Sequence, residues 1–101
     1  MVCLGNICRS PMAQGLMEHK IKLYGLPWQV DSAGTSSFHA GERPDERAIA
    51  CMKKYGIDIS NQSARPFQIK DFESFNLIYC MDKSNYRHVL NLAKNENHKK
   101  K

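Results

Sequence analysis

The chain has 101 residues, of which 42% are hydrophobic and 25% charged, and this ordinary globular composition excludes a wholly disordered protein. Its net charge of +5 suits an anionic ligand, but the lysines are scattered or terminal, so we expect no nucleic-acid partner. No apolar run approaches the roughly 20 residues of a membrane span and no signal peptide is visible, so we expect no membrane partner and a cytoplasmic location.

The length is that of one domain, which we place over residues 1–94, followed by a polar basic tail over residues 95–101. Helical and strand-like patterns alternate along the chain. This alternation predicts an α/β fold with a mostly parallel twisted sheet and helices on both faces.

The first motif is a cysteine and an arginine, Cys3 and Arg9, separated by five residues at the point where a strand is expected to turn into a helix. The intervening residues can curl so that their amide N–H groups point inward and bind an anion. The helix that follows adds its positive N-terminal end. We therefore predict a phosphate-binding loop formed by Leu4, Gly5, Asn6, Ile7, Cys8 and Arg9.

Each residue type of the loop suits this task. A thiol near inward amides, a helix N-terminus and an arginine is stabilised as the thiolate, the form in which Cys3 is a nucleophile. Gly5 and Asn6 tolerate the positive φ that such a loop needs, and the Arg9 guanidinium matches two phosphate oxygens as lysine cannot. Ser10 is expected to cap the helix and to place its hydroxyl near the sulfur. The alternative reading, a small buried thiol and an unrelated surface charge, explains most isolated Cys-x5-Arg pairs.

After the loop, apolar residues at helical spacing predict a first helix that ends at Gly25. Alternation over residues 28–30 predicts a strand that leads to Ser32, and the Gly-, Ser- and Thr-rich segment 34–44 predicts a loop on the ligand-binding rim. Asp45 is expected to open a second helix that Gly56 closes. Residues 57–59 then predict a short strand or turn, and residues 69–75 a short helix.

The uninterrupted apolar run over residues 77–81 predicts a strand covered on both faces. Ser84 is expected to cap a last helix. Cys51 and Cys80 sit in apolar patterns and are expected to be buried core thiols. In this arrangement Cys3, Ser32 and Asp82 each lie just past a strand end, which predicts that they converge on one rim of the sheet.

With Gly5, Asn6, Ser10 and Pro11 in place, the loop resembles the active-site signature of low molecular weight protein tyrosine phosphatases. Further segments resemble that family in the same order along the chain. They are Val30-Asp31-Ser32-Ala33-Gly34-Thr35, Gly41 with Asp45, Ala64-Arg65, Asp71-Phe72, Phe75 with Ile78, and Met81-Asp82-Lys83-Ser84-Asn85.

The resemblance implies a phosphatase that needs no metal or cofactor, acts on phosphotyrosine protein or a small aryl phosphate, and holds inorganic phosphate or another oxyanion in its loop. It implies that Ser32 supports the loop together with Asn6, that Phe38 lines the substrate cleft, and that His39 lies where specificity varies. It also implies a reversible disulfide between Cys3 and Cys8 that protects the nucleophile. The alternative for Cys8 is a small residue without a redox role.

The chain departs from the family pattern in three places. Only Met1 and Val2 precede Cys3, where the family has a full strand, so the expected fold is incomplete. Gln62 falls near a histidine of the family's loop-supporting network. The Asp-Pro-Tyr motif that carries the family's general acid is absent. Asp82 is the only substitute acid we nominate, and its alternative role is to cap the turn that follows.

The sequence thus predicts a cysteine-dependent phosphomonoesterase that forms a phosphocysteine intermediate. One alternative is a non-catalytic remnant that binds phosphate or a phosphopeptide, since the usual acid is missing. The other is an arsenate reductase, which would need a closely spaced pair of cysteines in the C-terminal half, where Cys80 stands alone.

Overall fold

The computed structural model of this protein describes residues 1–94; the predicted tail, residues 95–101, lies outside the described residues. The elements in chain order are β1 (Val2–Cys3), α1 (Arg9–Tyr24), β2 (Ala33–Gly34), α2 (Glu46–Lys53), α3 (Asp71–Ser74) and α4 (Lys83–Leu92). No helix among the described residues is long and apolar enough to cross a lipid bilayer.

A small parallel sheet stands at the centre of the fold. β1 and β2 pair in parallel, with Val2 opposite Ala33 and Cys3 opposite Gly34. Two isolated parallel bridges extend it, one from Val2 to Cys80 and one from Gly34 to residue 66. β1 and β2 are therefore the two inner strands, and each has a neighbour on both sides.

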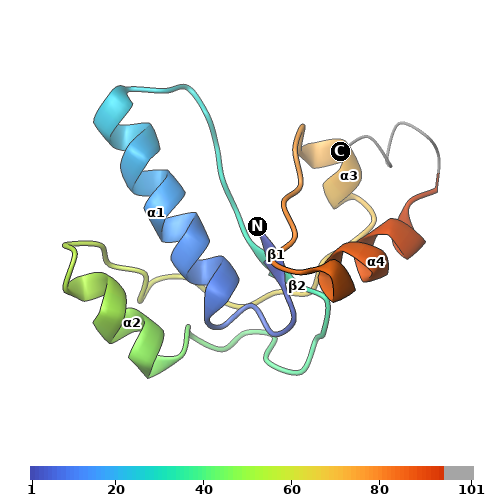
Figure 1. The fold of residues 1–101 in the computed structure, drawn as a ribbon, viewed down its shortest axis with the longest axis horizontal. Helices are drawn as coiled ribbons and strands as arrows, with labels where there is room; N and C mark the ends of the chain where they lie inside the picture. Colours follow the sequence, from blue (N-terminus) through green and yellow to red (C-terminus); the bar gives the residue numbers. More distant parts are fainter. Residues whose placement is uncertain (95–101) are drawn as a thin grey trace.

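Helices cover the sheet on both sides, with α1 and α2 on one and α3 and α4 on the other (Figure 1). Each side has its own apolar core. The core between α1 and α2 contains Ala48, Met52, Ile57 and Ile59. The core beneath α3 and α4 contains Val2, Phe72 and Val89. This arrangement confirms the predicted α/β fold.

The predicted helix boundaries are confirmed at Gly25 and Asp45 but not at Gly56, because α2 ends at Lys53 and Gly56, with φ 74°, follows three residues later. Gly25 has φ 63°, the left-handed conformation that ends α1. The Asp45 carboxylate accepts the Arg47 amide hydrogen bond at 2.9 Å and so begins α2. Ser84, by contrast, does not cap the last helix; Asp82 does, because its Oδ1 accepts the Asn85 amide hydrogen bond at 2.8 Å.

One predicted strand is wrong, and another is reduced to the bridge at Cys80. Residues 28–30 form no strand, and Trp28 is 61% exposed; β2 begins only at Ala33. Residues 77–81 are not covered on both faces, because the Leu77 and Tyr79 side chains are 65% and 55% exposed. Within residues 1–94, no backbone hydrogen bond reaches residues 28–30, whereas Val2 bonds to the Tyr79 carbonyl and the Met81 N–H on the second segment. Apolar side chains without a neighbouring strand form no ladder.

Three smaller expectations also change. Ile57 and Ile59 form no strand but are buried against α2. Cys51 is exposed rather than buried, and Cys80 is only partly buried.

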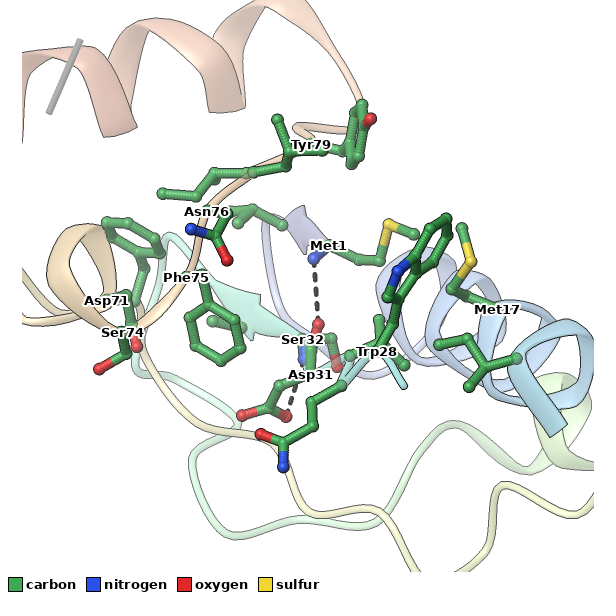
Figure 2. Close-up of a pocket in the computed structure, with 18 of the residues that line it drawn as sticks. Met1, Met17, Trp28, Asp31, Ser32, Asp71, Ser74, Phe75, Asn76 and Tyr79 are labelled. Atoms are coloured by element: carbon green, nitrogen blue, oxygen red, sulfur yellow. Dashed lines mark hydrogen bonds between the residues drawn. The ribbon is translucent and has the colours of Figure 1, made fainter. Parts of the chain in front are cut away.

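A pocket of about 540 Å³ opens between residues 27–31 and residues 74–79 (Figure 2). In this view Trp28 and Met17 lie on one side of Met1, and Phe75 and Asn76 lie on the other. Residues 3–10 do not line the pocket. It is therefore separate from the predicted phosphate loop, which follows the carboxyl end of β1.

Candidate active site

The loop between β1 and α1 has one strained position. Asn6 has φ 58° and is the only residue other than glycine with a positive φ within residues 1–94. Asparagine tolerates this conformation better than most residues. Gly5 was expected to share this role, but its φ is not positive. Gly5 instead provides space, since a Cβ there would lie 3.0 Å from Cδ2 of His39.

The Cys3 sulfur lies at the base of this loop, and only 3% of the residue is exposed. It accepts the backbone N–H of Asn6 at 3.2 Å and lies 2.9 Å from Oγ of Ser10. Ser10 is fully buried. Its expected capping role is wrong, because the N-cap residue is Cys8, without a side-chain cap, and Ser10 lies inside the first turn of α1. Its hydroxyl is directed at the sulfur instead.

Four amides of the loop have no protein acceptor. Within residues 1–94, the backbone N–H groups of Leu4, Gly5, Ile7 and Cys8 donate to no protein atom. They lie next to the N-terminus of α1, whose first turn contains no acidic residue. Unpaired amides beside a positive helix end form a site suited to an oxyanion.

The side chain of Asn6 ties the loop to its surroundings. Its Oδ1 accepts the backbone N–H of Arg65 at 3.0 Å, and its Nδ2 donates to Ser10 Oγ at 2.8 Å and to Ser32 Oγ at 2.9 Å. Because a backbone N–H can only donate, it fixes which end of the amide faces Arg65. Both serine hydroxyls then act as acceptors towards Asn6. The one hydroxyl proton of Ser10 is thus free to point at the Cys3 sulfur.

The network continues to two residues of α1 that the sequence did not predict, Gln14 and Glu18. The Ser32 hydroxyl donates to Gln14 Oε1, and Gln14 Nε2 donates to Glu18 Oε1 at 2.8 Å. Gln14 is only 9% exposed. A polar residue on the buried face of a helix, four positions after Ser10, is a signal that could have identified it. Ser32 precedes β2 rather than following a strand, but it does reach the predicted rim.

Arg65 connects the loop to two carboxylates. Its Nε lies 3.1 Å from Asp31 Oδ2, and one of its terminal nitrogens lies 2.9 Å from Asp71 Oδ2. Burial opposes the charge of the Arg65 guanidinium, but the bonds to Asp71 and Asp31 outweigh it, so the pKa of Arg65 is raised. The resemblance had marked the segments around these residues, but nothing in the sequence predicted the ion pairs.

Arg9 points to the rim where Asp82 lies. One of its terminal nitrogens is 3.1 Å from Asp82 Oδ2, and both side chains are close to half exposed. The amide hydrogen bond from Asn85, and then the hydrogen bond and charge of Arg9, lower the pKa of Asp82. The Asn6 network joins Cys3 to Ser32, and Arg9, from the same loop, pairs with Asp82, which is the arrangement that the predicted common rim requires.

Phe38 and His39 lie beside the loop. Their rings meet edge to face with centroids 4.8 Å apart, and Phe38 is 82% exposed. His39 packs next to Gly5, and its Nδ1 lies 2.8 Å from Glu42 Oε2. An exposed aromatic ring near the phosphate loop is available to contact a substrate.

The other predicted participants differ in their surroundings. Cys3 is buried and Cys8 exposed, and both are free thiols. Gln62 Nε2 donates to the Pro11 carbonyl at 3.0 Å, while its buried Oε1 has no hydrogen-bond partner among residues 1–94. No cluster of three or more His, Cys, Asp or Glu side chains within the described residues could hold a metal ion.

Comparisons with known proteins all lead to one family. A family model described as low molecular weight phosphotyrosine protein phosphatase matches residues 1–101. The human protein of that name is 46% identical over 88 residues, which are 85% of this chain and 55% of the human protein. The chain spans only 55–58% of the length of this and two similar curated relatives.

Solved structures agree with this result. The protein tyrosine phosphatase from Entamoeba histolytica superimposes with a TM-score of 0.92 at 38% identity, covering 98% of this chain and 64% of that one. The Drosophila arginine phosphatase superimposes with a TM-score of 0.82, also at 38% identity, covering 90% of this chain and 56% of that one.

Proposed function

Because the chain belongs to the low molecular weight phosphotyrosine protein phosphatase family, we propose that its domain over residues 1–94 hydrolyses aryl phosphate monoesters with Cys3 as the nucleophile. The observation that carries this proposal is the sulfur of Cys3 at the base of a loop whose amides are unpaired, with Asn6 and Ser10 in hydrogen-bond range. Family membership favours neither of the alternatives, a phosphate-binding remnant and an arsenate reductase.

In the proposed reaction the phosphate binds to the unpaired amides of Leu4, Gly5, Ile7 and Cys8 and to the fork of Arg9. The Cys3 thiolate attacks phosphorus, the bond between phosphorus and the ester oxygen breaks, and the phenolate that leaves takes up a proton from water. Water then breaks the sulfur–phosphorus bond and releases inorganic phosphate and the thiolate. Arg9 and the amides supply the charge stabilisation.

The Ser10 hydroxyl is proposed to assist both steps. It lies 2.9 Å from the sulfur and can donate to it. A donor to sulfur favours the thiolate before attack and favours it again as the leaving group when the intermediate is hydrolysed.

The natural substrate is proposed to be phosphotyrosine protein, with Phe38 and His39 beside the aromatic ring. The curated relatives are named for phosphotyrosine, whereas one solved relative is named an arginine phosphatase. The exposed Phe38 ring favours an aromatic ester, because stacked or edge-to-face rings attract each other. A flexible, charged phosphoarginine offers no such ring.

The test combines labelling with turnover. Iodoacetate should alkylate Cys3 below neutral pH, and phosphate or vanadate should protect it. The chain should release phosphate from p-nitrophenyl phosphate and from a phosphotyrosine peptide more readily than from phosphoarginine. Cys3→Ser should abolish the covalent phosphoenzyme and retain anion binding. Alkylation that begins only near pH 8.5, without protection, would exclude an activated nucleophile.

A preference for phosphoarginine would keep the nucleophile and overturn the proposed substrate. Phosphate binding without any turnover would favour the remnant. The exposed Cys51→Ser variant is the matched control, because it removes a thiol far along the sequence from the loop.

A further inference from the structure

We propose that Arg65 is a positioning residue for the nucleophile: its guanidinium, held by Asp31 and Asp71, fixes the peptide N–H that orients Asn6, and through Asn6 directs the Ser10 hydroxyl at Cys3. This inference rests on the proposed function and deepens it. No atom of Arg65 has to touch the substrate.

Two carboxylates anchor the Arg65 side chain. Asp31 precedes β2 and Asp71 begins α3, so the guanidinium joins two segments on either side of residue 65. Asp71 is 4% exposed and also accepts the Gln68 N–H at 2.8 Å. Charge-assisted hydrogen bonds of this kind are stronger than neutral ones and fix the planar guanidinium in place.

Two hydrogen bonds also anchor the Arg65 backbone. Its carbonyl accepts the Gly34 N–H at 2.8 Å, while its own N–H donates to Asn6 Oδ1 at 3.0 Å. The peptide units on both sides of this one residue are therefore bonded, one to β2 and the other to the loop. Because the anchored side chain and these two peptide units belong to one residue, we expect a loss of the ion pairs to shift the N–H that faces Asn6.

The N–H of Arg65 sets the direction of the hydrogen bonds that Asn6 makes with the two serines. Suppose that the N–H of Arg65 were withdrawn: the amide of Asn6 could then turn over and present its oxygen to the serines. The Ser10 hydroxyl would donate to that oxygen, and its proton would no longer point at the Cys3 sulfur. With Arg65 in place, Asn6 donates to both Ser10 and Ser32, and this alternative is closed.

The opposite end of the network is fixed in the same sense. A carboxylate accepts hydrogen bonds and donates none. Glu18 therefore accepts the side-chain N–H of Gln14, and this turns the Gln14 oxygen towards the Ser32 hydroxyl. Ser32 must then donate to Gln14 and accept from Asn6. Arg65 and Glu18 thus impose one direction on every bond between them, and the donor that remains is Ser10.

The experiment follows Cys3 itself rather than turnover. The rate of iodoacetate alkylation is measured across the pH range for the full chain, for Arg65→Met and for Arg65→Lys, with folding followed by circular dichroism. We expect Cys3 in Arg65→Met to be alkylated about tenfold more slowly at about pH 6, since a tenfold smaller thiolate fraction corresponds to a rise of one pKa unit. The rate should recover in alkaline solution, where the thiol is ionised in both proteins. Arg65→Lys keeps one cation for the two carboxylates and should be intermediate.

A milder variant covers the case in which Arg65→Met does not fold because the buried Asp71 loses its cation. Asp31→Asn keeps the oxygen that accepts the Ser32 N–H at 2.8 Å and replaces the oxygen that faces Arg65 by an amide donor. It should lower alkylation in the same direction as Arg65→Met. The matched control is Arg87→Met, which removes the same charge from an exposed position on α4 and should leave the profile unchanged.

The outcomes separate this inference from the proposed function. A full chain whose Cys3 shows no alkylation below neutral pH and no protection by phosphate contradicts the proposed function. A full chain that shows both, together with a folded Arg65→Met or Asp31→Asn whose profile matches it, overturns the positioning role alone. In that case Arg65 would serve stability only, and the variants would differ from the full chain in thermal unfolding but not in thiol reactivity.

Discussion

Arg9 and Asp82, which are 73 positions apart in the sequence, form an ion pair of 3.1 Å at the rim of the phosphate loop. The same carboxylate caps α4 through its other oxygen. The position of Arg9 is therefore fixed twice. Its backbone belongs to α1, and its side chain pairs with Asp82 at the start of α4. A bound phosphate would compete with Asp82 for the guanidinium.

Replacing Arg9 separates its charge from its shape. Arg9→Lys keeps the charge but loses the planar fork, and hydrogen bonds to charged groups contribute about 1.5–3 kcal/mol each. We expect phosphate and vanadate to bind at least about tenfold more weakly to Arg9→Lys, and nearly as weakly to it as to Arg9→Ala. Isothermal titration with vanadate measures this. Binding by the lysine variant as tight as by the unmodified chain would mean that Arg9 acts as a point charge.

Removing the Ser10 hydroxyl should weaken the nucleophile. In Ser10→Ala the Cys3 sulfur loses a donor at 2.9 Å, and one Asn6 proton loses its acceptor. We expect turnover of p-nitrophenyl phosphate to fall by about tenfold to hundredfold, from the worth of a charge-assisted hydrogen bond. Ser63→Ala, at an exposed position, is the control. Equal turnover in the two variants would contradict a donor role for Ser10.

Gly34 has no room for a side chain. A Cβ there would lie 2.8 Å from the Leu4 carbonyl oxygen and 3.1 Å from both the Gly5 carbonyl carbon and the Ser36 carbonyl oxygen. All three are backbone atoms, so the loop itself would have to move. We expect Gly34→Ala to lose about 1–3 kcal/mol of stability and to weaken phosphate binding as well.

The control for this effect is Gly15→Ala. Its Cβ would lie 2.5 Å from an Ile59 methyl group, in the core between α1 and α2. Urea unfolding should show a loss of stability in both variants, whereas only Gly34→Ala should change the affinity for phosphate. Equal affinities would show that the loop does not depend on Gly34.

Much of the site was predictable because its geometry is local. The spacing of Cys3 and Arg9, the positive φ of Asn6 and the cap at Asp45 all depend on residues within a few positions of one another. The chemistry of such short segments is determined by residue type. The same holds for the left-handed Gly25 that ends α1.

The sequence could not predict what depends on distant partners. Arg65 meets Asp31 across 34 positions, and Ser32 meets Gln14 across 18. The predicted strands are absent or shortened for a related reason. A strand at residues 28–30 or 77–81 requires a neighbour to bond with along its whole length, and no periodicity within a segment reveals whether that neighbour is present.

Acid should weaken the start of α4. The pKa of Asp82 is lowered in the folded chain, so its stabilising effect is complete above the ordinary aspartate pKa of about 3.9 and is lost as the pH falls through the lower, folded value. We expect Asp82→Asn, which keeps a capping oxygen but cannot be ionised, to flatten the loss of stability between about pH 4 and pH 2. Thermal unfolding measures this. A pH dependence identical to that of the unmodified chain would exclude a contribution from Asp82.

Hydrolysis of a phosphotyrosine ester requires a proton for the leaving group. A tyrosine leaving group has a pKa of about 10 and needs a proton as its bond to phosphorus breaks, whereas nitrophenolate is a much weaker base and leaves unaided. Asp82 is poorly suited to supply that proton, because one of its oxygens accepts the Asn85 N–H and the other pairs with Arg9, and these bonds lower its pKa. We therefore expect the chain to hydrolyse p-nitrophenyl phosphate slowly and phosphotyrosine peptides disproportionately more slowly, and we expect Asp82→Asn to leave the ratio of the two rates unchanged. Stopped-flow measurement of phosphate release from both substrates decides this. Similar rates on both that collapse in Asp82→Asn would make Asp82 the acid after all, and similar rates that survive the substitution would identify an acid elsewhere in the chain.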